Sequence, residues 1–292
     1  MSAIASIGIR GEYGFAAIRP DGSRRSVGRA QNLITSAGLE LIGTGDMDLL
    51  TCRVGNGTTP ATVGDTALGN ELLSIPVDSV SYAASSQPPY RGVSTAKFLQ
   101  SSASGQASYS EVSVNGASTA FSRALLADAL GNVSAYEFLA DELAEITYRV
   151  ILTPPSSDST FQIANGSITH ACTMRAADVT DPNSWCIPVD VTGGMADQDC
   201  EVSAYYGVLG EVTGHPTAII DTFTATADAY EAESRTLRVR CTLGPGDAND
   251  QGEITCLLFK TPLGAYQISF DPPIPKNNEI TVSFTFAIEW GQ

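Results

Sequence analysis

The sequence predicts a mostly β fold, made of two related antiparallel β-sandwich or barrel-like domains with one short helix near the N-terminus. Three observations predict it. The composition combines 43% hydrophobic with only 16% charged residues, which supplies core material but too little charge for a helical bundle. Short runs alternate between apolar and polar residues and are separated by turn residues. The end of the chain is similar to a segment in its middle, as internal duplication would produce.

The similarity joins residues 121–155 to residues 254–291, with a small shift in register. In both segments an apolar stretch leads to a Leu-Gly turn, at Leu130-Gly131 and at Leu263-Gly264. Both then reach a final alternating strand that opens Glu-Ile-Thr. We therefore expect two domains, residues 1–155 and residues 156–292, with the second a duplication of the first.

The length of the chain also favours two domains. A single hydrophobic core stops growing at roughly 250–300 residues, and the chain has 292. The boundary is expected at residues 153–159, because Pro154 and Pro155 interrupt hydrogen bonding there and the small polar residues that follow offer no face to a core.

The first half is expected to contain half-buried strands and one helix. Alternation of apolar with polar residues predicts the strands at residues 6–18, 52–55, 72–82, 92–100, 108–114, 121–127 and 146–152. The helix is predicted over residues 33–43, where apolar residues recur at helical spacing. Thr35 or Ser36 is expected to cap its start, and Gly43 to end it.

The second half repeats this pattern. Strands are predicted at residues 161–174, 201–212, 218–227, 236–243, 254–260, 265–270 and 279–290. A second, short helix can form over residues 181–185. The short, regular spacing of turns is typical of sandwiches and barrels.

The charge of the chain bears on its partners. A formal net charge of −16 repels phosphate, so no nucleic-acid partner is expected. Basic residues nevertheless gather near the N-terminus, at Arg10, Arg19, Arg24, Arg25 and Arg29. They either dock against an acidic partner or form a solvated hairpin tip around residues 19–24. Charged turns are common on surfaces, which favours the hairpin tip.

No targeting or membrane signal is expected in this sequence. The first residues lack the basic region and the apolar region of a signal peptide. No apolar run approaches the roughly 20 residues that span a bilayer. We therefore expect synthesis in a cytoplasm and no membrane span.

The six cysteines raise the question of disulfides. Cys186 and Cys200 flank one loop, and Cys241 and Cys256 flank another. If each loop closes an antiparallel hairpin, its two cysteines face each other at a separation that a disulfide spans. The alternative is that they stay buried thiols, which a reducing cytoplasm and the usual burial of free cysteine favour.

Metal binding has limited support in the sequence. There is no C-x-x-C motif and only two histidines, so zinc is not expected. Asp247, Asn249 and Asp250 are candidate calcium ligands, because residues 247–252 match part of an EF-hand loop. The twelfth position of that loop falls on Leu258 rather than on a bidentate glutamate, so a hairpin tip is the preferred interpretation.

Enzymatic activity is not expected, and neither is a cofactor. The chain has no Gly-x-Ser-x-Gly motif for a nucleophilic serine. Carboxylate pairs that a glycosidase could use occur at residues 141–142, 197 and 199, and 231 and 233. Such pairs arise freely on the solvated faces of an acidic chain, and nothing in the sequence indicates that they converge.

Several motifs resemble virion structural proteins of tailed bacteriophages, of the tail-fibre, minor tail or collar type. They are the runs NLITSAGL (residues 32–39), CRVGNGTTP (residues 52–60), FSRAL (residues 121–125) and DPPIPK (residues 271–276). Their order along the chain carries the resemblance, since each run alone is short. The resemblance implies a structural role in a tail, collar or baseplate, within the virion of a phage whose proteins are made in the host cytoplasm.

Two functions follow as expectations. The first is assembly: a symmetric homo-oligomer, such as a ring or trimer, whose edge strands and surfaces anchor other virion proteins. The alternative is a host-receptor protein that binds a surface glycan through exposed aromatic side chains. The candidates for that contact are Trp185, Tyr205, Tyr206 and Tyr230.

Overall fold

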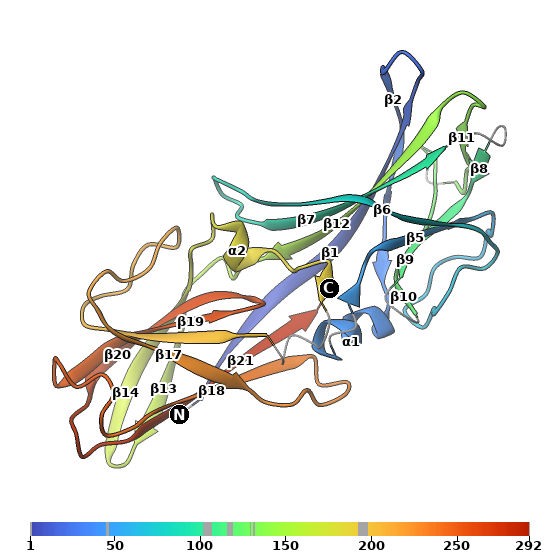
Figure 1. Cartoon of the computed structure of the whole chain (residues 1–292). Coiled ribbons are helices and arrows are strands. Elements are labelled where there is room, and N and C mark those ends of the chain that lie inside the picture. The colour runs from blue at the N-terminus through green and yellow to red at the C-terminus, as the bar shows by residue number, and fades with distance from the viewer. Residues whose placement is uncertain are drawn as a thin grey trace.

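The computed structural model describes residues 2–44, 47–101, 107–115, 119–128, 130, 132–191 and 198–291. Gly131 of the expected Leu-Gly turn and Asp197 of one carboxylate pair lie outside these residues. The protein is mostly β, with 58% of it in strands, and its sheet curls into a half-barrel (Figure 1). The predicted mostly β class is therefore confirmed.

The first half of the chain contains one helix and twelve strands in its described residues. They are β1 (Ser2–Ile18), β2 (Arg24–Gln31), β3 (Leu33–Ile34), α1 (Ser36–Thr44), β4 (Met47–Asp48), β5 (Thr51–Gly55), β6 (Glu71–Ala84), β7 (Gly92–Ser101), β8 (Ala107–Tyr109), β9 (Glu111–Asn115), β10 (Ala120–Leu125), β11 (Tyr136–Phe138) and β12 (Leu143–Thr153).

The helix begins later than residue 33, where the sequence predicts it to start. Leu33 and Ile34 instead form β3, which pairs with β10. Thr35 is the cap, because its Oγ1 accepts a hydrogen bond from the Gly38 N–H at 2.8 Å. A Cβ atom at Gly38 would lie only 2.0 Å from the Phe121 carbonyl oxygen, so the contact of α1 with β10 requires glycine at this position.

The second half contains one short helix and nine strands in its described residues. They are β13 (Ser159–Asn165), β14 (Ile168–Ala177), α2 (Pro182–Trp185), β15 (Asp190–Val191), β16 (Cys200–Tyr205), β17 (Ile219–Ala227), β18 (Thr236–Leu243), β19 (Glu253–Thr261), β20 (Gly264–Pro275) and β21 (Val282–Gly291). The short helix agrees with the prediction, and Asp181 caps it. The strand predicted over residues 201–212 ends at Tyr205, because the chain then turns back as a loop.

Strand β1 belongs to both halves of the protein (Figure 1). Its residues 8–18 pair with β12 in antiparallel fashion, and its residues 2–8 pair with β21 in parallel. One 17-stranded sheet therefore runs through both halves. The expected domain boundary near residue 155 stays a prediction.

The strands of the first half follow one another around a ring in which each neighbour is hydrogen-bonded except β2 and β3, which are joined only by the chain. The order is β1, β2, then β3 directly after β2 in the chain, β10, β9, β5, β6, β7 and β12, which returns to β1. Every one of these pairs is antiparallel. This ring surrounds an aromatic core in which Tyr13 and Tyr148 pack at 4.7 Å between ring centroids.

The pairings of the second half follow the same order without closing. The order is β13, β14, β20, β19, β16, β17, β18 and β21. Among the described residues, β13 has no partner on its outer edge, and β21 pairs with β1 instead. Phe259 and Phe286 stack in this core at 4.8 Å.

The two halves meet where β4 of the first pairs with β15 of the second. The strand order places β10 and β20 in the same position, whereas the sequence similarity aligns β10 with β19. Only the final strands, β12 and β21, correspond in both comparisons. Most buried apolar residues of the two halves form one continuous cluster, and a small second cluster lies in the second half.

Candidate functional site

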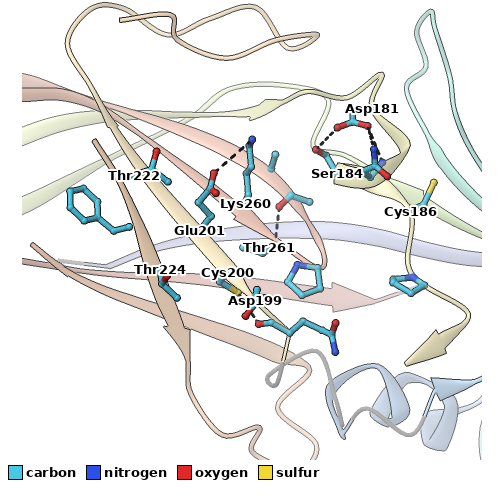
Figure 2. A pocket seen from close by; sticks show the side chains of 17 residues that line it. Asp181, Ser184, Cys186, Asp199, Cys200, Glu201, Thr222, Thr224, Lys260 and Thr261 are labelled. Carbon is cyan, nitrogen blue, oxygen red and sulfur yellow. Dashed lines mark hydrogen bonds and ion pairs between the residues drawn. The ribbon is translucent and has the colours of Figure 1, made fainter. Parts of the chain in front are cut away.

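A pocket of about 720 Å³ lies on the outer face of the second half (Figure 2). Strands β16, β17 and β19 form its floor, and α2 with the residues that follow it forms one wall. The lining is polar, with hydroxyl, amide and carboxylate groups that include Asp181, Ser184, Asp199, Glu201, Thr222, Thr224, Lys260 and Thr261.

Three of the four charged residues that line the pocket are held in contacts with the protein itself. Lys260 Nζ lies 3.8 Å from Glu201 Oε1, and both side chains are nearly half exposed, so the pair contributes little energy. Asp181 accepts hydrogen bonds from the Asn183 N–H at 3.0 Å and the Ser184 hydroxyl at 3.3 Å. Its carboxylate therefore caps α2.

The two thiols of the pocket are poor nucleophiles. Burial raises the pKa of Cys200 to about 11 and also raises the pKa of Cys186. Both therefore stay protonated near neutral pH, whereas the thiolate is the reactive form. Since no histidine lines the pocket, its described residues provide no activated nucleophile.

All six cysteines are buried free thiols in the structure. The hairpin expected between Cys241 and Cys256 is wrong, because β18 pairs with β21 and β17 while β19 pairs with β16 and β20. Cys241 consequently lies opposite Phe284. Cys186 follows the helix α2 rather than a hairpin strand, so it does not face Cys200 across a hairpin either.

The candidate calcium loop surrounds an amino group of the protein itself. Lys276 is fully buried, and its Nζ donates to the Gly244 carbonyl at 2.8 Å and to Asn249 Oδ1 at 2.9 Å. Asp247 accepts from the Gly244 N–H at 2.7 Å, and Asp250 is exposed. Of the three candidate ligands, Asn249 therefore binds the ammonium group and Asp247 binds the backbone. Nowhere in the described residues do three or more His, Cys, Asp or Glu side chains gather as a metal site.

Residues 19–24 form the turn and start of β2 in a β1–β2 hairpin, as the hairpin interpretation predicts, whereas Arg10 lies in β1 before this pairing begins. Arg25 Nη2 binds Glu142 Oε2 at 2.6 Å, and Arg19 Nε lies 3.8 Å from the same carboxylate. The hydrogen bond from Arg25 holds the pKa of Glu142 below its ordinary value. Arg24 likewise forms an ion pair, with Glu145.

The remaining two arginines point to solvent. Arg10 pairs with Glu12 at 3.1 Å. Arg29 has no ion pair with any described residue and lines a hollow of about 210 Å³ on the face of β1, β2 and β12. Four of the five candidates therefore make ion pairs within the chain, which leaves Arg29 as the arginine best placed to meet a partner.

The aromatic residues expected to contact a glycan do not form one exposed surface. Trp185 and Tyr205 are buried. Tyr230 stacks on Trp290 with ring centroids 5.8 Å apart. Only Tyr206 is well exposed, at 45%.

Buried polar residues that the sequence analysis missed hold the loop between β5 and β6, residues 56–70. Glu111 is fully buried and accepts from the N–H groups of Gly57, Gly69 and Asn70 at 2.7–2.9 Å. Arg123 binds the same carboxylate at 2.8 Å and Asp65 at 2.6 Å. We call Glu111, Arg123 and Asp65 the charged clasp.

The charged clasp shifts the ionisation of its carboxylate. Burial by itself would raise the pKa of Glu111. The N–H groups of Asn70 and Gly69 and the guanidinium of Arg123 outweigh burial and hold this pKa below its ordinary value. In the sequence, Glu111 and Arg123 are charged residues within predicted strands, a pattern that equally fits a solvent-facing side chain.

The second half holds its corresponding loop, residues 206–218, with an amide. Gln267 is fully buried, accepts from the Gly210 N–H at 2.6 Å and donates to the Gly210 carbonyl at 3.0 Å. Gln267 on β20 lies between β14 and β19, as Arg123 on β10 lies between β3 and β9. Beside it, Leu209 of the loop packs on the buried residues Ala177, Tyr205, Cys256, Leu258 and Ala265. We call Gln267 with this cluster the amide clasp.

Comparison with known proteins gave no matching family model, no matching curated protein and no matching solved structure. In the part of the chain that the structure describes, no helix combines the length and the apolar character needed to cross a membrane.

Proposed function

We propose that this chain is a non-enzymatic structural component of a tailed-phage virion, located in the tail, collar or baseplate, which assembles as a symmetric homo-oligomer and anchors other virion proteins. The observation that carries the proposal is the open edge of β13, since a strand with one unpaired side is a ready site for adding a strand from another chain. The assignment to a phage rests on the sequence motifs.

The proposal includes two related modules, one in each half. The shared strand order supports it, and so does the presence of Arg123 and Gln267 at the same position of that order. A protein built from two such modules presents similar surfaces twice, which suits a subunit that contacts several neighbours.

The chemistry of the described residues supports a non-enzymatic role. Neither histidine is placed beside a nucleophile: His170 is buried with Nδ1 2.6 Å from the Pro272 carbonyl oxygen, and His215 Nδ1 contacts Asp178 at 2.9 Å. Glu142, from one of the carboxylate pairs, is bound by Arg25. The polar groups that could take part in a reaction instead stabilise loops and helix ends.

Sedimentation analysis of the purified protein, with gold-labelled antibodies on intact phage particles, tests this proposal. We expect a discrete oligomer in solution and label at one place on the tail or neck. A protein that stays monomeric at high concentration, and whose loss leaves particles intact and infectious, would contradict it.

Host-receptor binding is the second candidate, favoured by one surface feature. Tyr206, Val208 and Ile219 are exposed at the β16–β17 loop, where the Tyr206 N–H bonds the Ala218 carbonyl. Exposed apolar residues at a loop are a common element of recognition surfaces. Binding of labelled protein to host cells that is lost in Tyr206→Ala, but kept in Tyr82→Ala as an exposed aromatic control, would support this alternative.

A further inference from the structure

The unpaired edge of β13 has a specific origin in the fold. In the first half, the first strand of the ring, β1, pairs with the last, β12. In the second half the last strand, β21, is already paired along one side with residues 2–8 of β1 and along the other with β18. Both edges of β21 are therefore occupied, so β13 cannot pair with it, and the ring stays open between β13 and β1.

The interior behind this opening is sealed by side chains. Phe161 and Ile163 of β13 meet Ala3 of β1 and core residues such as Phe270 and Phe284, and the space left between them is only about 10 Å³. An additional strand therefore does not need to fill the core. It can add to the backbone edge of β13 and cover the outward sides of Phe161 and Ile163, which are partly exposed.

Strands that are unpaired along one edge for all or part of their length carry features that discourage pairing with another chain. Strand β2 has three arginines, and β6 has Pro76 and Asp78 together with a shift in register. Strand β17 has Asp221, and its pairing with β16 also shifts in register. These are the usual protections of exposed edges.

Strand β13 has none of these protections. Its sequence STFQIAN contains no charge and no proline, and it pairs with β14 in one continuous register from Ser159 to Asn165. Because the chain carries a net charge of −16, two copies repel each other at long range, and an uncharged strand offers the least repulsive approach.

We propose that β13 pairs in antiparallel fashion with β13 of a second copy, about a two-fold axis at Gln162. This proposal rests on the proposed function and names one interface of the homo-oligomer. The strand suits pairing with itself, because Phe161 then lies opposite Ile163 of the partner subunit and Gln162 lies opposite Gln162 of the partner subunit. Both open half-barrels thereby join into one continuous sheet. A single strand pair buries less area than a standard interface, so we expect the contact to be weak in dilute solution.

Engineered cysteines test this register directly. In the proposed pair, the Cα atoms of the two Gln162 residues are about 4.5–5.5 Å apart, within the range that a disulfide spans. The two Thr160 residues are offset from each other by four positions along the paired strands, which separates them by about 13 Å. Both side chains are exposed, so Gln162→Cys and Thr160→Cys are matched variants that leave the core intact.

Under mild oxidation at high protein concentration, we expect Gln162→Cys to form a covalent dimer at least tenfold faster than Thr160→Cys. The wild-type protein serves as the background, since its six cysteines are buried. Equal cross-linking of the two variants, or none in either, would overturn the proposed pairing. Thermal unfolding of each variant confirms that both are folded.

A second variant separates this inference from the proposed function. Gln162→Lys places two like charges opposite each other and is expected to lower the sedimentation-derived association constant at least tenfold. If the wild type forms an oligomer that Gln162→Lys leaves unchanged, assembly uses another surface and the pairing of β13 is wrong, while the structural role stands. If the wild-type protein never associates, the result contradicts both the pairing of β13 and the proposed homo-oligomer.

Discussion

The loop after β5 and the loop after β16 occupy the same position in the two halves, yet they are held by different chemistry. The charged clasp uses a buried glutamate and arginine, whereas the amide clasp uses one glutamine over a small apolar cluster. Both satisfy backbone groups of a loop that turns back over the sheet. The difference teaches that this position requires hydrogen-bonding partners for the loop backbone, and that neutral or ionised side chains can supply them.

The two solutions carry different risks. A buried charge is stable only while its partner is present, because the desolvated group left behind is costly. A buried amide that is lost leaves neutral groups unpaired, which costs less. Substitutions at Arg123 and Gln267, which occupy equivalent positions, should therefore lower the unfolding free energy by unequal amounts.

The largest effect is expected from Arg123→Met. The variant leaves Glu111 buried without its cation and is expected to lose about 3–5 kcal/mol of unfolding free energy, as in other broken buried ion pairs. Urea denaturation followed by circular dichroism measures this loss. Arg123→Lys, which keeps the charge but not the forked geometry, is the control and should lose less. Equal losses in both variants would show that the contact with Glu111 depends on fork geometry alone.

The next effect is expected from Glu111→Gln, and it depends on pH. The folded-state pKa of Glu111 is lowered, so its stabilisation is present above the unfolded-state pKa and is lost as pH falls through the folded value. At neutral pH we expect a loss of about 1.5–3 kcal/mol, the contribution of hydrogen bonds to a charged group. Below the ordinary carboxyl range, near pH 4.3, the unfolding free energy of the wild type should approach that of the variant. Melting temperatures between pH 3 and 7 check this, and two parallel curves would contradict it.

A smaller effect is expected from Gln267→Leu in the second half. The Gly210 N–H loses its acceptor, but leucine extends the apolar cluster beside it, so we expect a net loss of about 1 kcal/mol. Hydrogen exchange should increase in residues 206–218 and stay unchanged in residues 56–70. Increased exchange in both loops would show that the two clasps are not independent.

The smallest effect is expected from Lys260→Met in the pocket of the second half. Its ion pair with Glu201 is exposed, so unfolding free energy should change by no more than about 0.5 kcal/mol. The same chemical denaturation experiment measures it. A loss as large as that of Gln267→Leu would mean that the pocket wall depends on this pair.

The sequence predicts much of the local structure of both halves. The mostly β class, a cap at Thr35 or Ser36 and the turn around residues 19–24 follow from alternation and from residues with strong local preferences, and the structure uses Thr35. The helix start was wrong, because Leu33 and Ile34 gain a pairing with β10 that helical spacing does not reveal. The pattern of residues within a segment reflects only local preferences, whereas the choice between helix and strand at Leu33 and Ile34 depends on β10, which is distant in the sequence.

The charged clasp could not be derived from the sequence for a related reason. Alternation along β9 and β10 separates two faces, but it does not tell which face a loop from elsewhere will cover. Glu111 and Arg123 therefore look like solvent-facing residues until the path of residues 56–70 is known. The parallel pairing of β1 with β21 is equally hidden, since it joins segments from opposite ends of the sequence.

That pairing has a consequence for how the protein is made. Of the strands described here, β1 leaves the ribosome first and β21 last, yet Ser2 must lie beside Thr285. Until β21 has been made, residues 2–7 are a largely apolar strand without this neighbour, and the second half cannot finish its sheet. Contacts between such distant segments slow folding, so the newly made β1 is where a chaperone would have most to protect.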